Sequence, residues 1–278
     1  MVKKIDELFS LSGKYIVITG AVGLLGAYHA EAVAAYGGTP ILLDLSQEEV
    51  DNLSLKLNDT FNVNAIGFSV DITDEDMLKS VSSEIFNRFG AVHGLVNNAA
   101  NNPKMESTSE MNFSRLENFP LDQWNKDIAV GLTGSYLCTK YFGSQMSRSE
   151  VGGSIVNISS DLGIIGPDQR LYAKEHIKNY KQDVKPVTYS IVKSGLIGLT
   201  RYTATYWAQD NVRCNAMCPG GIENDQPSEF LKEVSSRIPL NRLAKVTEYQ
   251  GTLIWMLSDA SSYLNGSIIA VDGGRTAW

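Results

Sequence analysis

The feature that most constrains the fold of this chain is a regular alternation of short apolar segments with longer segments of helical periodicity. The short segments are rich in β-branched residues, which is typical of buried strands; they are 15–19, 40–44, 65–70, 94–97, 154–159, 212–218 and 267–271. The amphipathic segments between them are expected to be helices; they are 24–36, 47–57, 74–89, 121–146, 187–209 and 247–257. Because strands that alternate with helices pair in parallel and are covered on both faces, the pattern predicts a doubly wound α/β fold.

No linker, composition shift or internal repeat interrupts this alternation, so residues 1–278 are expected to form a single domain. Two segments depart from it: 101–120 is polar and irregular, and 161–186 is rich in Lys, Tyr and Asp. Both would leave the carboxyl ends of strands, where open parallel sheets bind ligands. Long loops in compact domains are often functional, and a merely solvated insertion is the alternative.

Charge and composition exclude several kinds of partner. The chain has 31 Asp and Glu against 24 Lys and Arg, a formal charge of −7, whereas nucleic acids and anionic membranes favour basic surfaces. No apolar run approaches the ~18 residues of a membrane span, and the first residues lack the apolar core of a secretory signal. Cys138, Cys214 and Cys218 are too few for a disulfide framework, and no metal site is expected. We therefore expect a soluble cytoplasmic protein.

A glycine-rich turn follows the first strand. Gly20, Gly23 and Gly26 stand where strand gives way to helix, and glycines there permit a pyrophosphate to approach the helix N-terminus closely. Leu25, inside this turn, is a further candidate cofactor contact. Asp44 ends the second strand, 24 positions after Gly20, and a carboxylate there accepts from ribose hydroxyls and repels a 2′-phosphate. The pattern favours NAD over NADP, while a purely structural turn would also contain these glycines.

Tyr189 and Lys193 are four residues apart in a predicted helix, so their side chains share one face. An ammonium beside a phenol stabilises the phenolate and is expected to lower the pKa of the tyrosine. Tyr189 could then act as general base on an alcohol or as general acid on a ketone. A tyrosine and a lysine at this spacing also occur by chance on surface helices, so the pair gains meaning only from the other motifs.

Taken in order, the motifs resemble the short-chain dehydrogenase/reductase family over nearly the whole chain. They are the glycine turn, Asp71, NNAA at 97–100, Ser160, Tyr189 with Lys193, CPGGI at 218–222 and AVDGG at 270–274. The resemblance implies the single-domain branch of the family and a Rossmann-type parallel sheet of seven strands in the order 3-2-1-4-5-6-7. It also implies a symmetric homo-oligomer, a tetramer before a dimer, built on the helices 121–146 and 187–209.

The resemblance further implies cofactor contacts. Asp71 and Ile72 would hold the adenine edge, and Asn98 with Ala99 would line the adenosine ribose. The backbone of Ile222 would bind the nicotinamide carboxamide. Without the family, Asp71 would be interpreted as a turn or helix-cap residue.

By the same resemblance, Ser160 would orient the substrate oxygen toward Tyr189, and Lys193 would also reach a ribose hydroxyl. One position departs from the family, which carries an asparagine seven residues after the tryptophan that opens the helix 121–146. The corresponding position after Trp124 is Gly131. Because that asparagine helps a bound water to relay protons beyond the lysine, we expect another relay, a slower enzyme or an inactive protein.

Two further departures concern the substrate. Ser160 and Tyr189 are 29 positions apart, about twice the spacing expected from the family. The extra residues include four bases that could bind an anionic or sugar-like substrate or simply be solvated: Arg170, Lys174, His176 and Lys178. The spacing of the glycines is that of the extended branch of the superfamily, but the NNAA motif and the short tail favour the single-domain branch. Together with NPK at 102–104 and GRTAW at 274–278, this spacing weakly resembles members associated with surface-glycan or flagellin-glycan loci.

We therefore expect an NAD(H)-dependent oxidoreductase that interconverts a secondary alcohol and a ketone on a small polar, sugar-like substrate. Its pocket residues are expected from 101–105, 162–170 and 222–230. Two other hypotheses stay open: a dinucleotide-binding sensor or scaffold with little turnover, motivated by Gly131, and a sugar epimerase or dehydratase that oxidises its substrate transiently.

Overall fold

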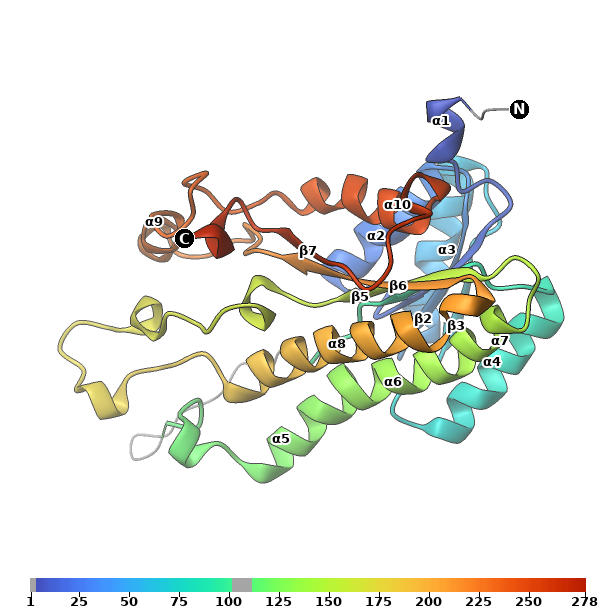
Figure 1. The fold of residues 1–278 in the computed structure, drawn as a ribbon. Coiled ribbons are helices and arrows are strands. Elements are labelled where there is room, and N and C mark those ends of the chain that lie inside the picture. The colour runs from blue at the N-terminus through green and yellow to red at the C-terminus, as the bar shows by residue number, and fades with distance from the viewer. Residues whose placement is uncertain (1–3, 102–111) are drawn as a thin grey trace.

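The computed structural model describes residues 4–101 and 112–278. At its centre is a seven-stranded parallel sheet in the order β3-β2-β1-β4-β5-β6-β7 (Figure 1). The strands are β1 Tyr15–Thr19, β2 Thr39–Asp44, β3 Ile66–Ser69, β4 Gly94–Asn97, β5 Gly153–Ile158, β6 Val212–Pro219 and β7 Ile268–Val271. The sheet type and the strand order confirm the Rossmann-type prediction.

Helices cover both faces of the sheet, as predicted (Figure 1). Successive side chains of a strand point to opposite faces, so Ile16 and Ile18 of β1 belong to one apolar core and Val17 to the other. The first core is closed by α2 Leu24–Ala35, α3 Gln47–Phe61 and α10 Gln250–Leu257. The second is closed by α4 Glu75–Phe89, α6 Ser135–Cys138 and α8 Val187–Tyr206.

The segment 121–146 is a continuous helical rod, but it is less regular than its sequence periodicity predicts. Two π-helical segments, Ala129–Gly134 and Thr139–Gly143, separate α5 Leu121–Ile128, α6 and α7 Ser144–Ser147. The rod approaches α8 closely at the first of them, because a Cβ atom on Gly131 would lie 2.5 Å from Cγ1 of Val192. The glycine therefore permits a helix–helix contact that a larger residue would push apart.

The segment 161–186 folds into three short 3₁₀ turns: η4 Asp161–Gly163, η5 Gln169–Tyr172 and η6 Asn179–Lys181. It packs against the segment 112–118, which contains η1 Leu116–Asn118. Nδ2 of Asn112 donates to Oδ1 of Asp183 at 2.9 Å, and the N–H of Val184 donates to Oγ of Ser114 at 3.1 Å. In Figure 1 this insertion extends beyond the N-terminal end of α8. The predicted pocket residues 102–105 lie outside the described residues.

The remaining elements are short, and α1 and α9 were not expected from the sequence. They are α1 Ile5–Leu8, α9 Ser228–Ser235, η7 Ala208–Asp210, η8 Val246–Tyr249, η9 Asp259–Ser261 and η10 Arg275–Ala277. Within the described part of the chain, none of the helices combines the length and the apolarity that crossing a membrane requires.

Candidate active site

The carboxyl ends of β1 to β6 open onto a cleft of about 760 Å³. A cleft of this size is within the range that holds small-molecule cofactors. Its walls contain the predicted cofactor residues except Gly26: Gly20, Gly23, Leu25, Asp44, Asp71, Ile72, Asn98, Ala99, Tyr189, Lys193 and Ile222.

The glycines of the turn differ in what they do. Gly20 adopts a φ of +61°, and a Cβ there would lie 2.8 Å from Cα of Ala99. A Cβ on Gly26 would collide with the carbonyl of Gly20, so Gly26 keeps α2 against the turn and lies behind the cleft wall. Gly23 is the N-cap of α2 and has no side chain with which to bond the first N–H groups of the helix. These backbone N–H groups can instead donate to a pyrophosphate.

Asp44 is fixed at the edge of the cleft by the glycine turn itself. Its Oδ2 accepts from the N–H of Val22 at 3.0 Å, and its Oδ1 accepts from the N–H of Leu45 at 2.8 Å. Each carboxylate oxygen keeps a second lone pair, so the group can still accept from ribose hydroxyls.

Asp71 and Asn98, which the sequence also predicts to contact the adenosine, form hydrogen bonds within the protein. Oδ1 of Asp71 accepts from the N–H and Oγ1 of Thr73 at 2.8 and 2.7 Å, which is the turn that its sequence position alone suggests. Nδ2 of Asn98 donates to the carbonyls of Thr19 and Gly20, both at 3.0 Å. Asn98 thereby ties the end of β4 to the glycine turn while it lines the cleft.

Ser160, Tyr189 and Lys193 lie close together: Tyr189 and Lys193 line the cleft, and Ser160 and Tyr189 line an adjoining pocket. Ser160 follows β5, and its Oγ donates to Oδ1 of Asp161 at 2.7 Å. Tyr189 and Lys193 occupy the first turns of α8. Nζ of Lys193 donates to the carbonyl of Ile158 at 2.8 Å and lies 5.9 Å from the centroid of the Tyr189 ring.

Burial dominates the electrostatics of this group. It lowers the pKa of Lys193 to about 8, because a buried ammonium loses its hydration. Burial also raises the pKa of Tyr189 above its usual value, and a hydrogen bond with Ser160 lowers it only in part. The lowered tyrosine pKa expected from the sequence is therefore not produced by this environment, since the loss of hydration outweighs the hydrogen bond with Ser160.

A second pocket, of about 200 Å³, adjoins the cleft at Tyr189. Ser160 and Tyr189 form its reactive side. Its apolar walls include Leu162, Pro167 and Phe230 from two of the three predicted pocket segments, and Leu171 and Val234 just beyond those segments. Arg275, from the C-terminal tail, enters the same pocket, and its Nη1 lies 3.0 Å from Oδ2 of the buried Asp161.

The basic residues that the sequence suggested for substrate binding lie away from this pocket. Arg170 pairs with Asp168 at 2.8 Å, Lys174 pairs with Asp183 at 2.6 Å, and the His176 side chain is 94% exposed. Lys178 is exposed as well. Besides Arg275, the basic residue that lines the pocket is Lys185, whose Nζ lies 3.9 Å from the centroid of the Tyr189 ring. Its signal in the sequence is only a four-residue spacing from Tyr189 across a proline.

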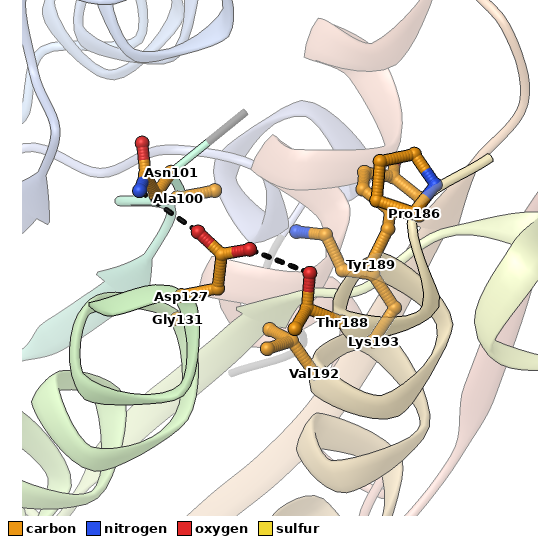
Figure 2. Close-up of a pocket in the computed structure, with 9 residues that line it drawn as sticks. All are labelled: Ala100, Asn101, Asp127, Gly131, Pro186, Thr188, Tyr189, Val192 and Lys193. Atoms are coloured by element: carbon orange, nitrogen blue, oxygen red, sulfur yellow. Dashed lines mark hydrogen bonds between the residues drawn. The ribbon is translucent and has the colours of Figure 1, made fainter. Parts of the chain in front are cut away.

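A small cavity of about 20 Å³ lies on the other side of Lys193, between α5 and α8 (Figure 2). That volume is room for about one water molecule. Figure 2 shows the Lys193 ammonium and the Asp127 carboxylate pointing into it, beside Gly131. Asp127 is 4% exposed and was not foreseen from the sequence.

The Asp127 carboxylate is held by three side-chain donors. It accepts from Oγ1 of Thr188 at 2.5 Å, from Nδ2 of Asn101 at 2.9 Å and from Nε2 of Gln123 at 2.7 Å. Asn101 is exposed, so this hydrogen-bonded group connects the cavity beside Lys193 with solvent.

Comparison with known proteins assigns the chain to a family. A family model described as enoyl-(acyl carrier protein) reductase matches residues 20–276. The chain is 31% identical over 271 residues to trans-4-hydroxycyclohexanecarboxylate dehydrogenase of Sinomonas cyclohexanicum, which covers 95% of this chain and 93% of that protein. The chain belongs to the short-chain dehydrogenase/reductase family.

Two further comparisons agree with this short-chain dehydrogenase/reductase assignment. NADP-dependent mannitol dehydrogenase of Alternaria alternata is 29% identical over 281 residues, 98% of this chain and 95% of that protein. The crystal structure of gluconate 5-dehydrogenase from Burkholderia cenocepacia J2315, in complex with NADP and tartrate, has a TM-score of 0.85 at 23% identity. It covers 99% of this chain and 100% of that chain, which confirms the fold. As a family member, this protein is an oxidoreductase of alcohol or ketone groups that uses a nicotinamide dinucleotide.

Proposed function

We propose that this chain is an NAD(H)-dependent dehydrogenase that interconverts a secondary alcohol and a ketone on a small polar substrate. The observation that carries the proposal is the position of Tyr189, which lines both the 760 Å³ cleft and the 200 Å³ pocket. A dinucleotide in the cleft and an alcohol in the pocket would meet beside its hydroxyl. The relatives named for hydroxycyclohexanecarboxylate and mannitol support a substrate with a ring or chain alcohol.

The choice of NAD rests on Asp44. Its carboxylate is held at the adenosine end of the cleft by Val22 and Leu45, where a 2′-phosphate would meet a fixed negative charge. The basic side chains among the described walls of the cleft, Lys185 and Lys193, lie at the Tyr189 end. They cannot offset that repulsion. A relative is NADP-dependent, so this preference has to be measured.

The bound dinucleotide supplies a hydride acceptor or donor, and the side chains supply the proton chemistry. With its pKa raised by burial, Tyr189 holds its proton at neutral pH, which suits general-acid catalysis of ketone reduction. In the oxidative direction Tyr189 must give up that proton, and the ammonium groups of Lys185 and Lys193 near its ring stabilise the phenolate. We therefore expect oxidation to be favoured by alkaline pH.

Asp127 provides the onward path for the proton in place of the family asparagine. It lies four residues before Gly131 in the same rod and points into the one-water cavity beside Lys193. In our proposal, a proton passes from Tyr189 toward Lys193, through a water in that cavity, to the Asp127 carboxylate, from which it leaves to solvent beside the exposed Asn101. The absence of the asparagine at Gly131 then no longer argues for a protein without turnover.

Calorimetry with NAD, NADH and NADPH, followed by NADH formation on a panel of polyols, hydroxy acids and cyclic alcohols, tests the proposal. We expect NAD(H) to bind more tightly than NADPH. We also expect Tyr189→Phe to bind NADH normally and to lose about 10²–10⁴-fold in turnover, the contribution of a general acid or base.

Other results would favour the competing functions. Normal NADH binding with no turnover on any substrate would support a dinucleotide-binding sensor. Cofactor retained through purification, with substrate conversion but no net NADH, would support an epimerase or dehydratase. Preferential binding of NADPH would overturn the assignment of Asp44 as the selector.

We also propose that the enzyme is a cytoplasmic homo-oligomer. Its three cysteines, Cys138, Cys214 and Cys218, are buried free thiols, which suits a reducing compartment. On the outer face of α8, Tyr202 and Tyr206 are 66% and 62% exposed, and exposed aromatic surface of this kind is typical of subunit interfaces.

A further inference from the structure

Lys185 lines three neighbouring cavities of the described structure. It directly precedes the N-cap of α8, and its backbone N–H donates to Oε1 of Gln169 at 2.8 Å. It lines the cofactor cleft, the 200 Å³ pocket and a third cavity of about 300 Å³ against the segment 114–117. Its ammonium lies over the ring of Tyr189, 3.9 Å from the centroid. A positive charge therefore lies over the ring whose hydroxyl would handle the proton.

The carboxylates near Lys185 form ion pairs and hydrogen bonds with other residues. Asp161 accepts from Oγ of Ser160 at 2.7 Å and pairs with Arg275 at 3.0 Å. Asp168 pairs with Arg170 at 2.8 Å and with Arg237 at 2.7 Å. In the part of the chain that the structure describes, no carboxylate forms an ion pair with Lys185.

Burying a cation without a counter-ion costs free energy. Burial accordingly lowers the pKa of Lys185, and the charge of Asp161 raises it only in part. A buried ammonium without a counter-ion, at the mouth of the substrate pocket, is suited to bind an anionic group of the ligand.

We infer that Lys185 binds an anionic group of the substrate, a carboxylate, so that the enzyme acts on hydroxy acids and the corresponding keto acids. This inference rests on the proposed dehydrogenase function and specifies its substrate class. The anion on Lys185 and the carbinol at Tyr189 and Ser160 would be separated by only a few bonds, which a small hydroxy acid spans. The apolar walls of Leu162, Leu171 and Phe230 would cover its hydrocarbon part.

A different role for Lys185 would be to tune Tyr189 alone, through its charge over the ring. The two roles predict different kinetics. A residue that binds the substrate anion affects KM and distinguishes charged from neutral substrates. A residue that only tunes the tyrosine changes kcat and its pH profile equally for both.

The experiment compares an acid with its neutral ester in the holoenzyme. With NAD saturating, kcat and KM are measured for 4-hydroxycyclohexanecarboxylate and gluconate, and for the methyl esters of both. We expect the wild-type enzyme to prefer the acids. In Lys185→Met, kcat/KM for the acids should fall about 10–100-fold, the worth of a charged hydrogen bond, mainly through KM, while the esters change little.

Two variants serve as controls. Lys185→Arg keeps the charge and should keep most of the preference for the acids. Lys178→Met makes the same chemical change at an exposed lysine of the same insertion, and it should leave both substrates unaffected. Thermal melting and NADH binding verify that each variant is folded.

The outcomes separate this inference from the function on which it rests. Equal turnover of acids and esters by the wild type, or an equal loss of both in Lys185→Met with a shifted pH profile of kcat, would show that Lys185 does not bind a substrate anion. If no alcohol is oxidised, the dehydrogenase proposal fails instead. The role of Lys185 can then still be tested by calorimetry of 4-hydroxycyclohexanecarboxylate binding to the NADH complex. A loss of affinity in Lys185→Met would support the anion site. An unchanged affinity, or no detectable binding to the wild type, would refute it.

Discussion

Asp127 is the residue whose replacement best tests the proton path. Asn is nearly isosteric but cannot take up a proton, so Asp127→Asn should slow proton release after alcohol oxidation. We expect kcat to fall about 100-fold, at the lower end of the range for acid–base groups, with an unchanged KM for NAD. The solvent deuterium isotope effect on kcat should also grow, because proton transfer becomes limiting.

Asp122→Asn is the matched control, since Asp122 is an exposed acid on the same helix. It should behave as wild type. An Asp127→Asn enzyme with normal kcat, or one that loses kcat only in proportion to a lost folded fraction, would remove Asp127 from the relay.

At this scale, the sequence could predict residues that belong to motifs but not residues brought in by packing. Asp44, Ser160, Tyr189 and Lys193 each follow a strand or share a helix face, and strand ends of a parallel sheet converge. Lys185 enters the site from the insertion, where its backbone N–H donates to Oε1 of Gln169. No spacing rule contains that contact.

At the scale of elements, the close approach of the helical rod to α8 depends on Gly131. In Gly131→Ala the new Cβ would lie 2.5 Å from Cγ1 of Val192, and overpacking of this kind costs about 1–3 kcal/mol. We expect a lower free energy of unfolding in urea, and a cost in Gly131→Ala/Val192→Ala smaller than the sum of the single changes.

Gly251→Ala provides the comparison, because Gly251 lies in α10 and a Cβ there meets nothing within 4 Å. That variant should be as stable as wild type or more so, since Ala favours helix over Gly by about 1 kcal/mol. Equal behaviour of the two alanine variants would contradict a tight contact at Gly131.

The parallel type of the strands was predictable because continuous apolar runs between amphipathic segments leave few packings, and their order was implied by the family resemblance. The two π-helical turns were not predictable from the sequence, because a helix keeps the same apolar face when one of its turns widens. Asp127 of α5 and Gly131 of the first π segment both line the cavity beside Lys193, but nothing in the sequence marks Asp127 as part of a site.

For the whole molecule, self-association is the property that the fold makes testable. The rings of Tyr202 and Tyr206 stack at 5.6 Å on the outer face of α8, beside the rod that carries the half-exposed Tyr136 (Figure 1). We expect light scattering to give the mass of a homo-tetramer. The double variant Tyr202→Glu/Tyr206→Glu should give a smaller species, since charge at an apolar interface opposes association.

Tyr263→Glu controls for added charge, because Tyr263 is a fully exposed tyrosine that follows η9 and is not part of α8. It should leave the mass unchanged. A monomeric wild type at micromolar concentration would refute the oligomer.

The salt bridge between Asp161 and Arg275 has a consequence for how the protein matures during synthesis. The two residues are 114 positions apart, and Asp161 also accepts from Ser160. The residues that line the cofactor cleft end at Gln226, but the cleft wall at Gly220 depends on later residues: the Tyr249 hydroxyl donates to its carbonyl, and the carbonyl of Val271 accepts from its N–H. The substrate pocket lacks one wall until Arg275 has left the ribosome. A nascent chain can therefore complete neither cavity before its last strand has been made, and the contact between Asp161 and Arg275 is the last to close the substrate pocket.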